Sequence, residues 1–430
     1  MYITHLHIDN VRRFSNASAV NLDLARPDGS YAGWTVFAGR NGSGKSTLLQ
    51  ALALTVVGPD FARSLKPSFE GWIHQGSTNA GTAVTLSGDP IRDRHLSSKS
   101  DTPSSVQPRL TWMSTEEGGP EPSLFQEGGE GQEGVRSGPW HANPEGWFLA
   151  GYGPFRRLTG AGMEPTPGPV RVRRLSGLFN EGAVLVDAIE WLVREVYFKA
   201  LEKRNGAEAL MEQVKLLLND GLLPDSAVIS RIDSDGIWVK QGGTEVELRG
   251  LSDGYRVVIA LVLDLVRLLH GCYGELNLSQ RDGRVVVDLP GVVLVDEIEA
   301  HLHVSWQKSV GFWLTQRFPA IQFLVATHSP FVCQAASPNG LIRLVGPGER
   351  AAVEIADPDT FLRVTRGDVD EAVLSDLFGL ESSRSVEAER LLSEYSRLRA
   401  LEMRGDPMTN EQMSELERLR AELPRTTTLR

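Results

Sequence analysis

Residues 34–57 read WTVFAGRNGSGKSTLLQALALTVV: an apolar stretch of strand length, a glycine-rich loop and an aliphatic stretch of helix length. The loop at 39–46 satisfies the pattern of a phosphate-binding loop. Its glycines let backbone N–H groups turn toward phosphate oxygens, and the dipole of the following helix favours bound negative charge. The stretch therefore predicts a strand–loop–helix unit that binds a phosphorylated ligand.

The loop residues have separate expected roles. Lys45 is expected to hold the β- and γ-phosphates of ATP, Ser46 to ligate Mg²⁺, and Thr47 to bond the α-phosphate. The other residues expected to contact the nucleotide are Gly39, Asn41, Gly42, Ser43 and Gly44. ATP and Mg²⁺ are therefore the expected cofactors.

Two further apolar stretches end in residues suited to nucleotide chemistry. At 292–297 the sequence VVLVDE places Asp296 at a strand end, where its carboxylate can orient the Mg²⁺ shell. Glu297, the next residue, is placed to polarise the attacking water. His328 follows the apolar strand at 323–326; such a histidine alone is more often structural, but the order of loop, acids and histidine favours a γ-phosphate sensor. The expected catalytic residues are Lys45, Glu297 and His328, and the expected metal ligands are Ser46 and Asp296.

Residues 251–256 read LSDGYR at the head of a long apolar helix. Ser252 alone could be a simple helix cap. In this position, however, the sequence resembles the signature motif of the ABC ATPase superfamily, which contacts the γ-phosphate of ATP bound to the opposite subunit. Ser252 and Gly254 match its serine and second glycine, whereas Asp253 replaces a glycine usual in transporters and brings a carboxylate near phosphate unless it turns away. The resemblance implies that all three residues contact nucleotide across an ATP-dependent head-to-tail homodimer or higher oligomer.

Other stretches resemble the RecF and SMC-like branch of this superfamily rather than transporter ATPases. In that branch the segment at 300–303 couples two active sites across a dimer. The stretch between Lys45 and Ser252 is too short for the long coiled-coil arm of chromosome-organising relatives, so a compact head is expected. The residues that carry the resemblance are Ile3, Leu6, Ile8, Asn10, Arg13, Phe14, the run EAHLH at 299–303 and THSP at 327–330.

Three stretches resemble the stand-alone ATPases of anti-phage defence operons, such as the PtuA-type subunits of Septu and retron-associated systems. They read GYGPFRR at 151–157, LSDGYR at 251–256 and DEIEAHLHVSW at 296–306. The resemblance implies an ATPase that dimerises on ATP and controls a separate nuclease subunit, because the hundred or so residues after Pro330 lack the spaced acidic clusters of a metal-dependent nuclease. The alternative is a RecF-like DNA-binding repair or loading factor without a nuclease partner. A transporter engine would not explain the RecF-like first strands.

One part of the ABC pattern is missing. These ATPases usually carry a glutamine that coordinates Mg²⁺ after the strand between the phosphate loop and the signature. The best location is the loop that follows the apolar stretch at 147–152, and this loop contains no glutamine. Arg156 or Arg157 could face the nucleotide or DNA there, or could be solvated surface residues.

Composition narrows the class of protein. The chain has 430 residues, 41% of them hydrophobic, and no apolar run approaches the roughly 20 residues of a membrane helix. Residues 1–9 lack the features of a signal peptide, so we expect a cytoplasmic protein that binds no membrane. Cys272 and Cys333 are expected to be unpaired thiols. The formal net charge of −11 argues against a surface covered by nucleic acid but leaves room for a local basic groove.

These observations predict an α/β protein: a P-loop ABC ATPase head with a mixed sheet, an antiparallel β lobe, a helical lobe and a C-terminal helical hairpin. The hairpin is expected from a cap at Ser385 and a capping box from Thr409 to Gln412. The segment at 94–146 is rich in Gly, Ser, Pro and Glu and is expected to be a flexible insertion, although Trp112, Phe125 and Trp140 could order with a partner. The expected divisions are 1–93 (first ATPase lobe), 94–146 (insertion), 147–250 (rest of that lobe and helices), 251–345 (second ATPase lobe) and 346–430 (tail, a possible docking region).

Overall fold

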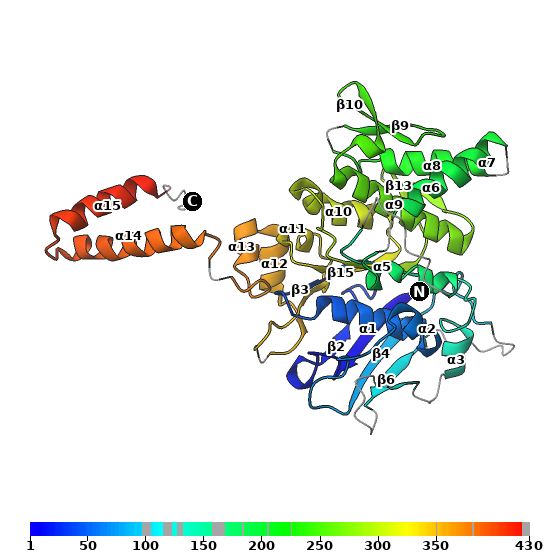
Figure 1. The fold of residues 1–430 in the computed structure, drawn as a ribbon, viewed down its shortest axis with the longest axis horizontal. Helices are drawn as coiled ribbons and strands as arrows, with labels where there is room; N and C mark the ends of the chain where they lie inside the picture. Colours follow the sequence, from blue (N-terminus) through cyan, green and yellow to red (C-terminus); the bar gives the residue numbers. More distant parts are fainter. Residues whose placement is uncertain are drawn as a thin grey trace.

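The computed structural model describes residues 1–96, 105–114, 123–126, 132–156, 168–182, 185–203, 206–224, 226–349, 351–380 and 382–423. Two large sheets organise the body of this part of the chain, and a helical lobe lies beside them (Figure 1). The α/β fold class predicted from the sequence is confirmed. No helix in these ranges is both long and apolar enough to cross a membrane.

The central sheet carries the strand that precedes the glycine-rich loop. Its order is β17-β16-β3-β15-β14-β8, with β17 antiparallel to β16 and every other neighbouring pair parallel. Because parallel strands end on the same side, their carboxyl ends form one edge of the sheet. The strands are β3 (Gly33–Ala38), β8 (Leu149–Tyr152), β14 (Gly291–Asp296), β15 (Ile321–Thr327), β16 (Leu341–Arg343) and β17 (Glu354–Ile355).

The second sheet is antiparallel and corresponds to the antiparallel β lobe that the sequence predicts. Its order is β2-β1-β4-β6-β7, and β5 also pairs with β4. Helix α1 (Lys45–Val57) contacts β4 of this sheet and both β14 and β15 of the central sheet, which explains why it is buried on nearly all sides. The strands are β1 (Tyr2–Asp9), β2 (Val20–Asp23), β4 (Asn79–Ser87), β5 (Ser105–Val106), β6 (Arg109–Met113) and β7 (Ser123–Gln126).

Part of the segment at 94–146 is built into this second sheet, which the composition did not indicate. Strand β6 pairs with β4, and Trp112 on β6 is fully buried against Phe69 and Trp72. Trp140 is also buried, and its ring nitrogen donates to the Thr55 carbonyl at 3.0 Å. These two tryptophans belong to the core rather than to a partner surface. The side chain of Phe125 and most of the acidic stretch lie outside the described residues.

The helical lobe packs around the long helix α9 (Asp253–Tyr273), which contacts α6 and α8. Two small sheets flank it, β11-β10-β9 and β12-β13. Among the described residues β13 pairs with β12, with which it forms a hairpin, and not with a strand of the central sheet. The elements are α6 (Val186–Glu190), the π-helical η2 (Trp191–Tyr197), α7 (Phe198–Leu201), α8 (Ala207–Asn219), β9 (Val228–Ile232), β10 (Ile237–Gln241), β11 (Thr244–Glu247), η3 (Leu248–Gly250), β12 (Leu278–Arg281) and β13 (Arg284–Val287).

The remaining helices connect these layers. Helix α10 (Val304–Arg317) follows β14 and contacts β3 of the central sheet, and α11 (Pro330–Cys333) packs on α10. Cys272 and Cys333 are both free thiols. The shorter elements are η1 (Asn16–Ser18), α2 (Pro59–Leu65), α3 (Gln132–Ser137), α4 (Val170–Arg173), α5 (Ser176–Phe179), α12 (Pro358–Arg366) and α13 (Val369–Val373).

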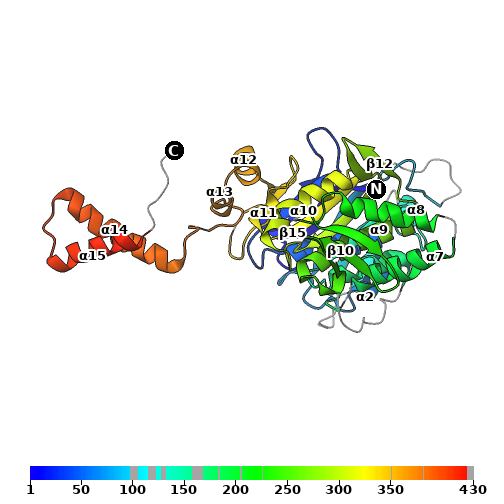
Figure 2. The ribbon, with the colours of Figure 1, turned by 90° about the horizontal axis from the view of Figure 1, so that it is seen from above.

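The C-terminal hairpin consists of α14 (Val386–Arg404) and α15 (Asn410–Glu422) and projects away from the body (Figures 1 and 2). Its predicted caps are confirmed: the Ser385 side chain accepts from the backbone of Ala388, and Thr409 forms a capping box with Gln412. The two helices share a small apolar core of Leu398, Leu416 and Leu419. The hairpin therefore has a small apolar core of its own.

Candidate nucleotide site

The residues predicted to act on nucleotide converge at the carboxyl edge of the central sheet. In the register of β14 and β15, Asp296 is opposite Ala326, and in that of β15 and β3, Thr327 is opposite Ala38. Strands that are distant in the sequence therefore end level with one another. The glycine-rich loop, the acidic pair and His328 all begin at this edge.

The glycine-rich loop has the backbone that its sequence predicts. Gly42 and Gly44 have φ angles of 75° and 91°, in the left-handed region that favours glycine. A side chain on Gly39 would come within 2.7 Å of the Leu344 carbonyl. Helix α1 begins directly after Gly44, so its free backbone N–H groups face the loop. The loop can therefore bind an anion at the helix N-terminus.

Lys45 lies inside this loop. Its ammonium donates to the carbonyls of Gly39 at 2.9 Å and Arg40 at 3.2 Å, and lies 3.5 Å from Nδ1 of His328. Burial lowers the pKa of Lys45 to about 8, although the carboxylates near it, of which Asp296 has the largest influence, counteract this shift. The cation is thus partly desolvated and available to an anionic ligand.

Asp296 and Ser46 form an oxygen-rich pair beside Lys45. Burial raises the pKa of Asp296 to about 6; the Ser46 hydroxyl, within hydrogen-bonding reach, lowers this pKa, and the charge of Glu297 raises it further. The Asp296 carboxylate is 3% exposed, and its Oδ1 atom has no hydrogen-bond partner among the described residues. A buried carboxylate oxygen without a partner next to a hydroxyl suits a hard divalent cation, which prefers oxygen ligands.

Glu297 follows Asp296 in an unusual backbone conformation. Its φ angle is 47°, in the left-handed region, which non-glycine residues rarely adopt. Its N–H donates to the Ala326 carbonyl at 2.9 Å, so the main-chain turn is fixed to β15. Its carboxylate influences the pKa values of both Lys45 and His328, so the side chain lies within the same charged cluster.

His328 is positioned by a residue whose role the sequence analysis missed. Glu299 Oε1 accepts from the backbone N–H of His328 at 2.6 Å, while its buried Oε2 has no partner among the described residues. Burial and the nearby Lys45 lower the pKa of His328, which favours the neutral imidazole. The spacing of acids in DEIE at 296–299 is the only sequence signal for this contact.

Arg156 occupies the loop where the sequence lacks a glutamine, and it faces the backbone of the acidic segment. The side chain is 4% exposed, so it is neither a surface residue nor a group that reaches toward DNA. Its guanidinium donates to the carbonyls of Gly153 (3.0 Å), Asp296 (3.1 Å), Glu297 (2.6 Å), Ile298 (3.1 Å) and Ala300 (3.4 Å). Burial lowers the pKa of Arg156 to about 10, which still leaves it charged at neutral pH. Arg157 lies outside the described residues.

The Arg156 contacts predict a positioning role that a substitution can test. We expect Arg156→Lys to lower kcat for ATP by about tenfold, and Arg156→Gln by up to about a hundredfold, because a displaced turn misplaces Glu297. KM for ATP should change less than about threefold, since Lys45 and the glycine-rich loop remain. The exposed Arg173 provides the matched control, Arg173→Gln. A rise in KM with unchanged kcat would contradict the positioning role.

The other predicted loop residues are spread around this cluster. Ser43 is fully buried, and its hydroxyl has no hydrogen-bond partner among the described residues. Thr47 accepts from Arg12 at 3.4 Å. Asn41 is exposed. Arg13 donates to the carbonyls of Gly42 and Gly346, which the sequence did not reveal.

The signature residues are not part of this cluster within one protomer. Helix α9 contacts other helices of its lobe, and no contact with α1 is among its main packing partners (Figure 1). Ser252 precedes α9, but its side chain makes no capping hydrogen bond, so the simple cap role is wrong. Asp253 is ion-paired with Arg256. A side chain on Gly254 would come within 2.9 Å of the Trp306 ring, so close helix packing requires glycine there.

Comparisons with known proteins agree with this geometry. A family model described as "AAA domain, putative AbiEii toxin, Type IV TA system" matches residues 198–334, and a second, "AAA domain", matches residues 5–124. The Septu protein PtuA of Bacillus mycoides (strain KBAB4) is 26% identical over 356 residues, which are 82% of this chain and 41% of the relative. The Septu protein PtuA of Bacillus thuringiensis is 27% identical over 50% of this chain and 54% of the relative. The chain thus spans about half the length of these curated relatives.

The chain is also similar to a retron ATPase and to a solved SMC head domain. The Retron Vc95 probable ATPase of Vibrio cholerae serotype O1 biovar El Tor is 36% identical over 29% of this chain and 22% of its own length. The SMC head domain of Thermotoga maritima aligns with 83% of this chain and 100% of its own at 14% identity, with a TM-score of 0.42. The motif order and the two AAA-domain models, which imply nucleotide binding, support an ABC-type ATPase head. Within that class it resembles the ATPases of Septu and retron systems.

Proposed function

We propose that this chain binds ATP with Mg²⁺ at the edge of the central sheet and hydrolyses it. The observation that carries this proposal is the convergence of Lys45, Ser46, Asp296, Glu297 and His328 from three separate strands. Hydrolysis of ATP to ADP and phosphate by the purified chain, measured by phosphate release, is the direct test. If the chain binds ATP but does not hydrolyse it, either alone or with its natural partners, the hydrolysis part of the proposal is wrong and only ATP binding remains.

The residues present suit Mg²⁺. Ser46 and Asp296 would hold the ion, which when bound would neutralise charge on the phosphate oxygens. The unpartnered Oδ1 of Asp296 supports this role, because a buried carboxylate oxygen without a partner is unfavourable on its own. Lys45, freed from the carbonyls of Gly39 and Arg40, would contact the β- and γ-phosphates.

The proton transfer is assigned to Glu297. Its carboxylate would accept a proton from the attacking water, and the left-handed backbone holds it just beyond the strand end. His328, fixed by Glu299 and favouring the neutral form, would orient the water and sense the γ-phosphate. These roles need no movement of the central sheet.

A second copy is proposed to complete each site. Ser252, Asp253 and Gly254 would meet the nucleotide of the opposite protomer, with the segment at 300–303 between the two sites. Two observations support this: the Ser252 side chain makes no capping hydrogen bond, and the Asp253 carboxylate is paired with Arg256 and so is partly neutralised toward phosphate. A head-to-tail dimer formed only with ATP is the expected assembly.

We further propose that ATP turnover regulates a nuclease effector in anti-phage defence; the similarity to Septu and retron proteins supports the defence role. The division at 1–93, 94–146, 147–250, 251–345 and 346–430 assigns effector docking to the tail, and the projecting hairpin supports this. Purification of the native complex tests the idea: a stoichiometric nuclease-like subunit, lost when residues 382–430 are removed, is expected. Recovery of the full chain alone would favour the RecF-like alternative.

The pKa values of Asp296 and Lys45 predict a bell-shaped pH dependence of Mg-nucleotide affinity. Below about pH 6 a proton on Asp296 competes with Mg²⁺, and above about pH 8 Lys45 loses its charge, so affinity should fall about tenfold per pH unit on either side. Titration with a fluorescent ATP analogue between pH 5 and 9 measures this. The acid limb should be shallower in Asp296→Asn than in the wild type, because only protonation of the ATP phosphate, with a pKa of about 6, then remains; equal limbs would contradict the assignment of Asp296.

A further inference from the structure

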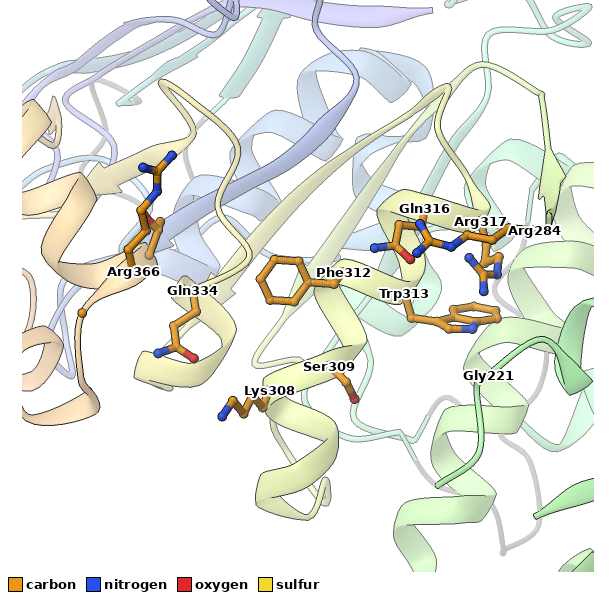
Figure 3. Close-up of a pocket in the computed structure, with 12 residues that line it drawn as sticks. Gly221, Arg284, Lys308, Ser309, Phe312, Trp313, Gln316, Arg317, Gln334 and Arg366 are labelled. Carbon is orange, nitrogen blue, oxygen red and sulfur yellow. The ribbon is translucent and has the colours of Figure 1, made fainter. Parts of the chain in front are cut away.

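A cavity of ≈ 620 Å³ lies along one face of α10 and shares no residue with the candidate nucleotide site. Six of its lining residues follow the helix at the spacing of a single face. The other lining residues come from four segments that are far apart in sequence: β13, the loop after α8, the end of α11 and the end of α12. The α10 residues are Lys308, Ser309, Phe312, Trp313, Gln316 and Arg317. We call this cavity the α10 groove (Figure 3).

The α10 groove is basic on a chain with a formal net charge of −11. Arg284, Lys308, Arg317 and Arg366 line it, and no carboxylate does. Arg284, Lys308 and Arg366 are exposed, and no ion pair is recorded for them within the described ranges. Uncompensated positive charge from several distant segments is expected where a polyanion binds.

Arg317 is the cation of this groove that is buried and held in place by neighbouring groups. It is 5% exposed, its Nε lies 3.0 Å from Asp220 Oδ2, and its Nη2 donates to the Asp220 carbonyl at 2.9 Å. Its Nη1 has no hydrogen-bond partner in the described part of the chain. Burial lowers the pKa of Arg317; the Asp220 carboxylate counteracts this shift, and the like charge of Arg284 adds to it. An anion beside Arg284 would relieve the repulsion between the two guanidinium groups.

Aromatic rings lie between the charges. Phe312 is 43% exposed, an unusual position for a large apolar ring. In Figure 3 its ring lies between Arg366, Gln334 and Lys308 on one side and Trp313, Arg317 and Arg284 on the other. An exposed ring flanked on both sides by cations suits a single nucleic-acid strand, with a base stacked on the ring and a phosphate on either side of it. A single phosphate or mononucleotide would use only one of the two cationic groups.

We propose that the α10 groove binds single-stranded nucleic acid, with phosphates against Arg284 and Arg317 at one side and Lys308 and Arg366 at the other, and a base stacked on Phe312. This site is separate from the proposed ATPase function and stands without it. DNA and RNA share the chemistry that the groove would recognise, and the test distinguishes them.

Fluorescence anisotropy of labelled 20-nucleotide oligothymidylate and oligouridylate with the full chain tests the proposal. Affinity for at least one of them should fall with salt at a logarithmic slope of about −3, the value for four phosphate contacts on a single strand. Arg284→Ala should make the slope shallower by about 0.7. Phe312→Ala should weaken binding about five- to a hundredfold and leave the slope unchanged.

Matched controls separate the groove from general charge. Phe198 is 44% exposed on another helix, so Phe198→Ala should leave oligonucleotide affinity within about twofold of the wild type. The unfolding temperature of Arg284→Ala and Phe312→Ala should stay within a few degrees of the wild type, which shows that these variants are folded. Lys45→Ala should still bind the oligonucleotide.

Four results would overturn the proposal. They are no binding of either oligonucleotide, equal binding by wild type and Phe312→Ala, loss of binding in Lys45→Ala, and displacement by polyglutamate as effective as by the unlabelled oligonucleotide. Loss of binding in Lys45→Ala would place the oligonucleotide at the nucleotide site. Equal displacement by polyglutamate would mean that the groove recognises negative charge alone.

Discussion

Glu297→Gln is expected to lower ATP turnover by at least about a hundredfold, because the amide keeps the shape of the side chain but cannot accept the proton of the attacking water. Nucleotide affinity should stay within about threefold of the wild type, since Lys45 and the glycine-rich loop are unchanged. Unconsumed ATP should then hold two protomers together, and light scattering after chromatography in Mg-ATP should show a dimer that wild-type protein loses with time.

The control for this substitution is Glu417→Gln, which removes an exposed carboxylate from α15. It should leave turnover and assembly unchanged. If Glu297→Gln hydrolyses ATP at the normal rate, the assignment of the general base is wrong. Glu299, whose Oε2 atom has no partner in the described ranges, is then the next carboxylate to test.

Lys45→Ala should weaken ATP binding by at least about a hundredfold, because each charge-assisted hydrogen bond to phosphate contributes about 1.5–3 kcal/mol. The unbound protein should keep its unfolding temperature within a few degrees. Burial already lowers the pKa of this ammonium, so its loss removes a desolvation cost together with the bonds to Gly39 and Arg40. Calorimetric titration with ATP measures the first effect and thermal unfolding the second.

Lys240→Ala provides the comparison, since Lys240 is an exposed lysine on β10. It should bind ATP as the wild type does. Unchanged ATP affinity in Lys45→Ala would contradict the predicted loop chemistry, whereas a large fall in unfolding temperature would mean that Lys45 stabilises the loop rather than the ligand.

The central edge of the fold could be predicted because its signals are local. An apolar strand followed by GRNGSGKS, by an acidic pair or by a histidine places each group at a strand end, and parallel pairing then brings the ends together. The caps of the C-terminal hairpin were predictable for the same reason, because Ser385, Thr409 and Gln412 act within one helical turn.

Contacts between distant segments could not be predicted in this way. Arg156 donates to backbone carbonyls 140 or more residues away. Every residue has such a carbonyl, so the sequence does not indicate which ones Arg156 contacts. Strand β6 was hidden in a polar segment because it buries only Leu110 and Trp112, and Trp112 is buried against two rings from a distant segment. The α10 groove is likewise assembled by the fold: Arg284, Arg317 and Arg366 have no spacing that would suggest a common surface.

The backbone at Glu297 shows what this edge costs the molecule. A left-handed non-glycine residue is destabilising by about 1 kcal/mol or more, and glycine would relax the turn. The hydrogen bonds from Arg156 and to Ala326 keep the turn in place nonetheless. At this edge of the sheet the protein thus loses conformational stability and gains a carboxylate in a fixed position. Stabilising substitutions commonly expose this trade-off between stability and activity.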